Sequence, residues 1–84
     1  MYLARVFITP KPTVSDPEGQ TIQGGLRELG FDTVRSVRAG KYLEVLLEEV
    51  SEESARSKVQ SMCDRLLANP VIEEYRFELE RVEP

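Results

Sequence analysis

The sequence predicts an α+β fold of the βαββαβ, ferredoxin-like type, with a four-stranded antiparallel sheet and two helices on one face. Apolar residues alternate with the two-residue period of strands near both ends of the chain, and two amphipathic segments have the 3.6-residue period of helices. Short breaks at Ala39-Gly40 and Asn69-Pro70 separate these segments. Two successive strand-helix-strand units usually form such a sandwich through right-handed crossovers.

The first strand is predicted over residues 2–9, where both faces are substantially apolar. After a proline-rich connection, Asp16-Pro17 has the residues of a helix N-cap followed by proline at the first helical position. The sequence therefore predicts that the first helix begins there.

The first helix has a weak helical composition but a clear apolar stripe, made by Ile22, Leu26 and Leu29. Gly30 is predicted to end it in the left-handed conformation. Gly24 and Gly25 each lower the stability of the helix by about 1 kcal/mol relative to alanine. Close approach of another backbone would explain why these two glycines are tolerated.

A second strand is predicted over residues 33–38, with a bulge between Val34 and Val37. Ala39-Gly40 then supplies a tight turn into a third strand over residues 41–50. One face of this third strand consists of Leu43, Val45 and Leu47, and the other of Tyr42, Glu44, Leu46 and Glu48.

The second helix is capped by Ser51, and its apolar stripe is Ala55, Val59, Met62, Cys63 and Leu66. Asn69 tolerates the left-handed conformation that follows a helix, and Pro70 cannot continue one. The last strand is expected to start at Val71-Ile72. Its core side is Val71, Tyr75, Phe77 and Leu79, and its charged side is Glu74, Arg76, Glu78 and Glu80.

Helices on one face of the sheet would leave its other face open. That open face would carry Tyr42 and Leu46 together with one side of the first strand. Exposed apolar residues in such a position indicate a protein partner.

The length of 84 residues corresponds to one domain over residues 1–84, whose own core is small enough to favour self-association or docking on a larger partner. The net charge of −4 argues against binding to nucleic acid or to anionic membranes. No signal peptide, membrane span or disulfide framework is visible, so the cytoplasm is the expected location.

The sequence contains no histidine, so the commonest general base and metal ligand is absent. We therefore do not expect this chain to catalyse a reaction on its own. Cys63 is predicted to be an inert core thiol because it lies in an apolar helical stripe. A metal site is a weaker interpretation than a solvated helix start for four acidic residues, Glu48, Glu49, Glu52 and Glu53. Gly40-Lys41 lacks the other residues of a phosphate-binding loop, and residues 41–47 lack the aromatic motif of RNA-recognition domains.

Five segments resemble, in order and spacing, the PurS family of small subunits of phosphoribosylformylglycinamidine synthase, also called formylglycinamide ribonucleotide amidotransferase. They are Asp16-Pro17-Glu18-Gly19, Leu29-Gly30-Phe31, Val37-Arg38-Ala39-Gly40-Lys41, Met62-Cys63 and Leu67 to Tyr75. The resemblance runs essentially from end to end, and the first loop departs from it by its extra prolines.

The resemblance implies a non-catalytic assembly subunit in purine biosynthesis, acting in the ATP- and glutamine-dependent amidation of formylglycinamide ribonucleotide. It implies a homo-oligomer that bridges a glutaminase subunit and a large synthetase subunit and assists ammonia transfer. ATP and magnesium are expected on the synthetase subunit, and no cofactor, metal or catalytic residue is expected on this chain.

The residues expected at partner interfaces fall into two groups. The open sheet face, with Tyr42 and Leu46, is expected to pair two copies. The larger subunits are expected to contact the basic turn and the corner after the second helix, that is Arg35, Arg38, Lys41, Asn69 and Pro70. Local backbone geometry and a solvated hairpin end are equally simple interpretations of these last residues.

The alternative function is a ligand-sensing regulatory domain of the ACT type, which shares this order of elements. Such sensors use a glycine-rich first loop, whereas the first loop here is proline-rich and Gly19 falls inside the predicted helix. An independent enzyme is a third and weaker interpretation.

Overall fold

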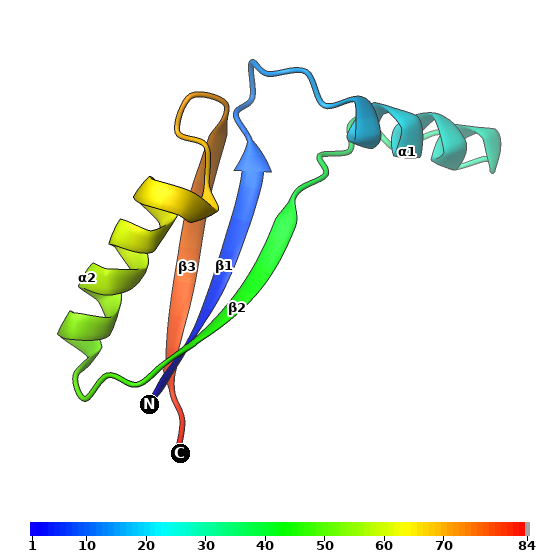
Figure 1. Ribbon diagram of the computed structural model, residues 1–84. Coiled ribbons are helices and arrows are strands. Elements are labelled where there is room, and N and C mark those ends of the chain that lie inside the picture. The colour runs from blue at the N-terminus through cyan, green and yellow to red at the C-terminus, as the bar shows by residue number, and fades with distance from the viewer. Residues whose placement is uncertain (84) are drawn as a thin grey trace.

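A three-stranded antiparallel sheet and two α-helices form the fold in the computed structural model, which describes residues 1–83 (Figure 1). The elements in chain order are β1 (Tyr2–Pro10), α1 (Pro17–Glu28), β2 (Lys41–Leu47), α2 (Glu52–Met62), a π-helical turn η1 (Cys63–Leu67) and β3 (Glu73–Arg81). The strand order is β2-β1-β3, so β1 pairs with both other strands.

The predicted fold class is correct as α+β, but the four-stranded sheet with two helices on one face is not confirmed. Residues 34–40 form no strand and no turn, and α1 extends away from the sheet (Figure 1). The backbone of residues 34–35 bonds to α1 instead, because Gln23 Nε2 donates to the Arg35 carbonyl at 3.3 Å and Arg27 Nη2 to the Val34 carbonyl at 2.9 Å. Only α2 covers the sheet.

The predicted turn at Ala39-Gly40 is also corrected. The Ala39 amide donates to Asp16 Oδ2 at 2.8 Å, which holds the chain in an open path. Gly40 is required for a different reason, since a Cβ there would lie 2.3 Å from the carbonyl oxygen of Ile8. The glycine therefore permits close approach to β1 and does not form a hairpin loop.

The core lies between one face of the sheet and α2. Its centre is made by the inward side chains of β1 and by the stripe of α2, namely Ala4, Val6, Ile8, Ala55, Val59 and Cys63, which are buried. Tyr2 and Leu47 are buried at the end of the sheet where the chain begins. The inward residues of β2 and β3 are those that the alternating sequence predicted, whereas for β1 the sequence did not distinguish the core side from the open side. Val71, also predicted on the core side, precedes β3 and is 77% exposed.

The end of the second helix differs from the predicted stripe. In η1 the Ala68 amide donates to the Cys63 carbonyl, five residues back, so the turn is wider than an α-helical turn. This rotates Leu66 outward, where it is 83% exposed, and brings Leu67 and Ala68 toward the core.

The corner after η1 uses side-chain bonding and not the left-handed conformation predicted for Asn69. Among residues 1–83 only Gly30 has a positive φ, of 96°, which confirms the predicted cap of α1. The Val71 amide donates to Asn69 Oδ1 at 3.0 Å, and the Asn69 amide donates to Glu73 Oε1 at 2.8 Å. With these bonds in place, β3 begins at Glu73, two residues after the predicted start at Val71.

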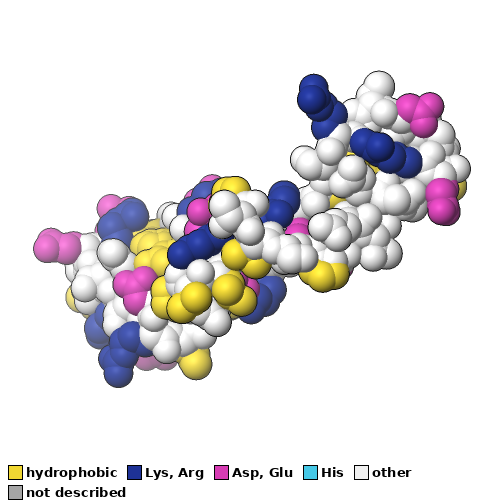
Figure 2. Space-filling model, turned by 90° about the horizontal axis from the view of Figure 1, so that it is seen from above, with side chains coloured by type: hydrophobic (Ala, Val, Ile, Leu, Met, Phe, Trp, Pro, Cys, Tyr) yellow, Lys and Arg dark blue, Asp and Glu magenta, His cyan; other side chains and the backbone are white. Residues whose placement is uncertain are grey.

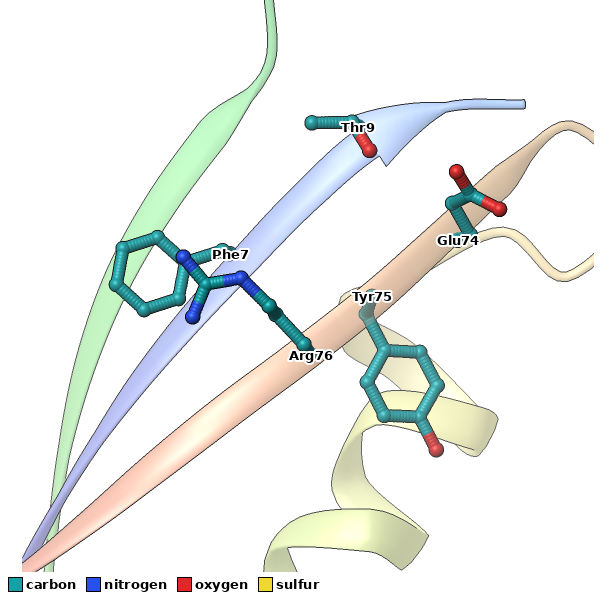
Figure 3. Close-up of a pocket in the computed structure, with 5 residues that line it drawn as sticks. All are labelled: Phe7, Thr9, Glu74, Tyr75 and Arg76. Carbon is teal, nitrogen blue, oxygen red and sulfur yellow. The ribbon is translucent and has the colours of Figure 1, made fainter. Parts of the chain in front are cut away.

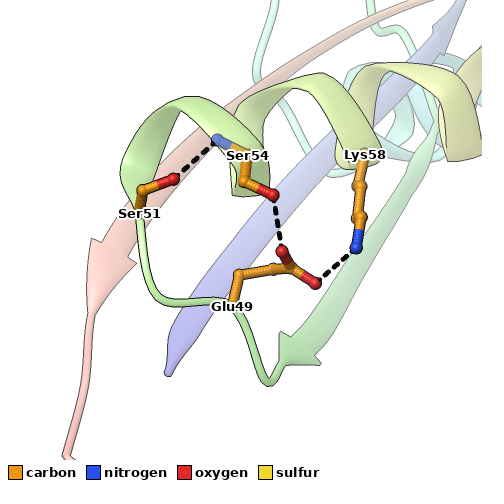
Figure 4. A network of polar contacts seen from close by, with 4 residues as sticks. All are labelled: Glu49, Ser51, Ser54 and Lys58. Carbon is orange, nitrogen blue, oxygen red and sulfur yellow. Dashed lines mark hydrogen bonds and ion pairs between the residues drawn. The ribbon is translucent and has the colours of Figure 1, made fainter.

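A small polar network joins the end of β2 to the start of α2 (Figure 4). Ser51 Oγ accepts a hydrogen bond from the Ser54 amide at 3.1 Å, which confirms the predicted N-cap. Glu49 accepts from Lys58 Nζ at 2.8 Å and from Ser54 Oγ at 2.6 Å. The bonds from Lys58 and Ser54 lower the pKa of Glu49 below its usual range.

Replacement of Ile8 tests the position of the core. Ile8 is 1% exposed, so we expect Ile8→Ala to lower the free energy of unfolding by about 2–5 kcal/mol. The matched control is Ile72→Ala, because Ile72 is 43% exposed and should change stability much less. Urea unfolding followed by circular dichroism measures both, and equal losses would contradict this placement of the core.

Candidate partner-binding surfaces

The open face of the sheet is the side opposite α2. Its members come from all three strands: Leu3, Arg5, Phe7, Tyr42, Glu44, Leu46, Arg76, Glu78 and Glu80. Tyr42 is 50% exposed and Leu46 is 58% exposed, so the predicted apolar positions are accessible in the single chain.

Aromatic and guanidinium groups stack at the centre of this open face. The Arg76 guanidinium lies 3.9 Å from the centroid of the Phe7 ring, and the Phe7 and Tyr42 rings are 5.2 Å apart. Figure 3 shows Arg76 reaching across toward Phe7 while Tyr75, the next residue on β3, points to the opposite side, toward the helix. These rings and Arg76 form a rigid, partly apolar surface suited to protein contacts.

Charged pairs border the aromatic centre. Arg5 Nη2 lies 2.6 Å from Glu80 Oε1, and Arg76 Nη1 lies 3.2 Å from Glu78 Oε2. The Tyr42 hydroxyl donates to Glu44 Oε2 at 2.7 Å, which raises the pKa of Tyr42. The open face is thus amphipathic, and Figure 2 shows acidic and basic side chains interspersed over the molecule.

The second surface is the arm, which we define as residues 16–38, and the arm base where it meets the sheet. Asp16 is buried at the arm base and accepts from the Gly19 amide at 3.0 Å and from the Ala39 amide at 2.8 Å. These two backbone bonds lower the pKa of Asp16. Its carboxylate therefore caps α1 and fixes the returning chain at the same time.

The structure brings most of the predicted basic group and corner to the arm end of the sheet. Arg38 Nη2 donates to the carbonyls of Pro10 and Lys11, at 2.9 and 2.7 Å, so part of its donor capacity is used within the chain. Lys41 Nζ lies 3.6 Å from Glu73 Oε2. The other carboxylate oxygen of Glu73 accepts a hydrogen bond from the Asn69 amide, so Glu73 links Lys41 to the corner.

The remaining predicted interface residues are distributed more widely. Pro70 follows Asn69 at this corner and is exposed, whereas Arg35 lies on the arm. Tyr42 and Leu46 lie on the open face. The seven residues therefore lie in three regions, not in a single compact site.

Several features of these surfaces were missed from the sequence. The stacking of Arg76 on Phe7 depends on strand register, which no local pattern reveals. The exposure of Ile22 and Leu29 was missed because their helical spacing was interpreted as a core stripe. Asp16 was predicted as a cap, but its second bond, to Ala39, links positions 23 residues apart.

Among residues 1–83, no group of three or more acidic, cysteine or histidine residues comes together in a way that could hold a metal ion. None of the described helices is both long and apolar enough to cross a membrane. Cys63 is buried, and burial raises the pKa of its thiol, in agreement with the predicted inert core position.

The fold is that of a small α+β protein with amphipathic faces that are accessible in the single chain. The PurS family, described as phosphoribosylformylglycinamidine (FGAM) synthase, matches residues 3–81. This chain belongs to the PurS family.

Relatives and solved structures agree over nearly the whole chain. The Synechocystis sp. phosphoribosylformylglycinamidine synthase subunit PurS is 48% identical, covering 98% of this chain and 82% of the relative. The crystal structure of Methanocaldococcus jannaschii PurS, one of the subunits of formylglycinamide ribonucleotide amidotransferase, has a TM-score of 0.87 and 44% identity, covering 99% of this chain and 100% of the other.

A chain in the structure of PurLQS from Thermotoga maritima is also similar, with a TM-score of 0.83 and 32% identity. The match covers 95% of this chain and 99% of that chain. A relative of the same size is therefore found in an assembly with other subunits.

Replacement of Asp16 tests the arm base. Asn offers one acceptor oxygen and no charge, so we expect Asp16→Asn to weaken the bonds to the Gly19 and Ala39 amides and speed their hydrogen exchange at neutral pH. Since the folded pKa of Asp16 is lowered, its contribution is present above the usual carboxyl pKa and is lost as the pH falls through the folded value. The difference between the two proteins should disappear in acid.

Asp32→Asn serves as the control, because Asp32 is an exposed carboxylate on the same arm. It should leave both amides protected. Equal exchange at Ala39 in the wild type and in Asp16→Asn at neutral pH would contradict this role of Asp16.

Proposed function

We propose that this chain is the small assembly subunit of phosphoribosylformylglycinamidine synthase in purine biosynthesis, joining a glutaminase subunit to a large synthetase subunit. The observation that carries the proposal is the match to the PurS family over residues 3–81, together with the similar chain in PurLQS. In this role the chain contributes surfaces, and its partners contribute the catalytic groups.

A bridging subunit has a physical role in this reaction. Ammonia released into bulk water is diluted and protonated, whereas a closed interface keeps it neutral and at high local concentration. In the proposed complex, this chain helps to close the interface through which ammonia passes. ATP and magnesium bind to the synthetase subunit, which amidates formylglycinamide ribonucleotide, and the assembly acts in the cytoplasm.

The contacts proposed for the larger subunits lie at the arm end of the sheet and on the arm. Arg38 and Lys41 supply positive charge at the arm end, and Arg35 adds a positive charge on the arm. The Asn69-Pro70 corner is linked to Lys41 through Glu73. Such a local positive region favours a partner with a complementary acidic surface and makes the contact sensitive to salt.

Self-association completes the proposal. Tyr42 and Leu46 expose apolar area on the open face, which supports a contact between two copies there. The ligand-sensing alternative gains no support from the comparisons, since the matching family and the similar chains are PurS subunits.

Charge reversal at the arm end tests the bridging role. We expect Arg35→Glu with Lys41→Glu to reduce co-purification with the two larger subunits and to lower glutamine-dependent activity about tenfold or more. Activity with added ammonium should persist, because it does not require transfer between subunits. Arg38 is left intact because its bonds to Pro10 and Lys11 stabilise the arm base.

A matched control reverses two charges elsewhere, with Arg56→Glu on α2 and Arg81→Glu at the far end of β3. This variant should retain glutamine-dependent activity. Full activity of the Arg35→Glu, Lys41→Glu complex would reject the contact assignment, and failure of the wild-type chain to co-purify would reject the proposed function.

A further inference from the structure

The wide turn η1 directs one large apolar side chain outward. Leu66 follows Val59 by seven residues and Cys63 by three, and both of those residues are fully buried. A regular α-helix would therefore point Leu66 at the core. Instead the Ala68 amide donates to the Cys63 carbonyl at 3.0 Å, and Leu66 is 83% exposed. Leu67 takes the inward position and packs against the buried cluster.

The fold does not require an apolar residue at position 66. Leu66 belongs neither to the buried cluster nor to the side chains packed against it. A polar residue there would leave the core unchanged and would expose less apolar surface to water. Turns of the π type are rare and are frequent at functional sites. Contact with a partner therefore explains this outward leucine better than folding does.

The corner that follows η1 continues the apolar surface. Val71 is 77% exposed and Ile72 is 43% exposed. The five residues of chain from Leu66 to Val71 span at most about 18 Å, whereas a stable interface of about 800 Å² per partner is about 30 Å across. One partner can therefore cover both sites. Figure 2 looks down on this end of the molecule and shows hydrophobic side chains gathered on the body, away from the arm.

The unpaired charges beside these side chains are basic. Arg65 precedes Leu66 and is exposed. Lys11 lies beside the corner, because its amide donates to the Ile72 carbonyl at 2.9 Å. Within residues 1–83, neither Arg65 nor Lys11 has a carboxylate oxygen within ion-pair distance. We define Arg65, Leu66, Val71 and Ile72 as the corner surface.

The neighbouring carboxylates already have partners within the chain. Asp64 accepts a hydrogen bond from the Tyr75 hydroxyl at 2.7 Å. Glu73 contacts Lys41 and accepts from the Asn69 amide. The corner surface is therefore apolar and positive on a chain with a net charge of −4, and it complements an apolar surface bordered by acidic groups. Two copies facing each other through it would bring like charges together.

We propose that the corner surface docks a larger subunit of the proposed complex, with Leu66 as the apolar anchor and Arg65 as the partner of a carboxylate. The occupant is thus a protein surface that has an apolar pocket bordered by acidic side chains, and it is not a second copy of this chain. An aliphatic anchor in a pocket with a polar rim is a usual centre for a protein interface. This inference rests on the proposed function and adds a contact surface to those at the arm end.

Deletion of Leu66 tests the anchor without disturbing the core. The Ala68 amide would then follow the Cys63 carbonyl by four residues, which is the spacing of an α-helix. Leu67 should keep its inward position, so the variant should unfold at a urea concentration close to that of the wild type. Its dissociation constant for one larger subunit should rise about tenfold or more.

Two substitutions give the same test without a change of length. Leu66→Asp should weaken binding to a similar extent, whereas Val50→Asp should not, because Val50 is 95% exposed in the connection between β2 and α2. Arg65→Glu should weaken binding and make it less sensitive to salt. Its matched control is Arg81→Glu, at the far end of β3.

Binding is measured by surface plasmon resonance on the immobilised chain. The glutaminase and synthetase subunits are injected separately and together, which identifies the subunit that the corner surface contacts. Hydrogen exchange provides a second readout, since the backbone amides of residues 65–72 should exchange more slowly in the wild-type complex than in the free chain. Circular dichroism shows that each variant is folded.

Three results would overturn the inference. The first is binding of the Leu66 variants to both larger subunits as tightly as the wild type. The second is unchanged exchange of residues 65–72 in the complex. The third is a lower mass of these variants in sedimentation equilibrium, which would show that a second copy covers Leu66. Failure of the wild-type chain to bind either subunit would instead reject the proposed function, and this inference with it.

Discussion

The pairing of β1 with both other strands is the constraint on which the structure depends. Its inward residues, Ala4, Val6 and Ile8, are almost fully buried. Both other strands pair with β1, and α2 packs against it. The same strand places Phe7 and Arg5 on the open face, because alternate side chains point to opposite sides. One strand thus fixes both the core and the outer surface on which partner contacts are proposed.

Local chemistry made much of the fold predictable from the sequence. Asp16 and Ser51 act as N-caps, Gly30 adopts the left-handed conformation, and β2 and β3 place their apolar residues on the expected faces. Each of these features depends on residues within a few positions of one another. Such local features are therefore predictable even when the position of the helix or strand in the fold is not.

The failures concern choices that local sequence does not determine. Residues 33–38 have the composition of a strand, but side chains of α1 bond to their backbone and the segment does not pair with the free edge of β2. At Asn69, side-chain bonds replaced the predicted left-handed backbone, and the wide turn at η1 rotated Leu66 out of the core. For the candidate interfaces, the sequence correctly predicted exposed Tyr42 and Leu46, but not the stacking of Arg76 on Phe7, which depends on register.

The separation of α1 from the sheet leaves Leu29 and Phe31 exposed in the single chain. A partner that covered these side chains would add hydrophobic burial that the chain alone lacks and would stabilise the fold by mass action. Dilution of that partner would then weaken the fold as well as the assembly. Without the partner, the same side chains stay accessible to proteases.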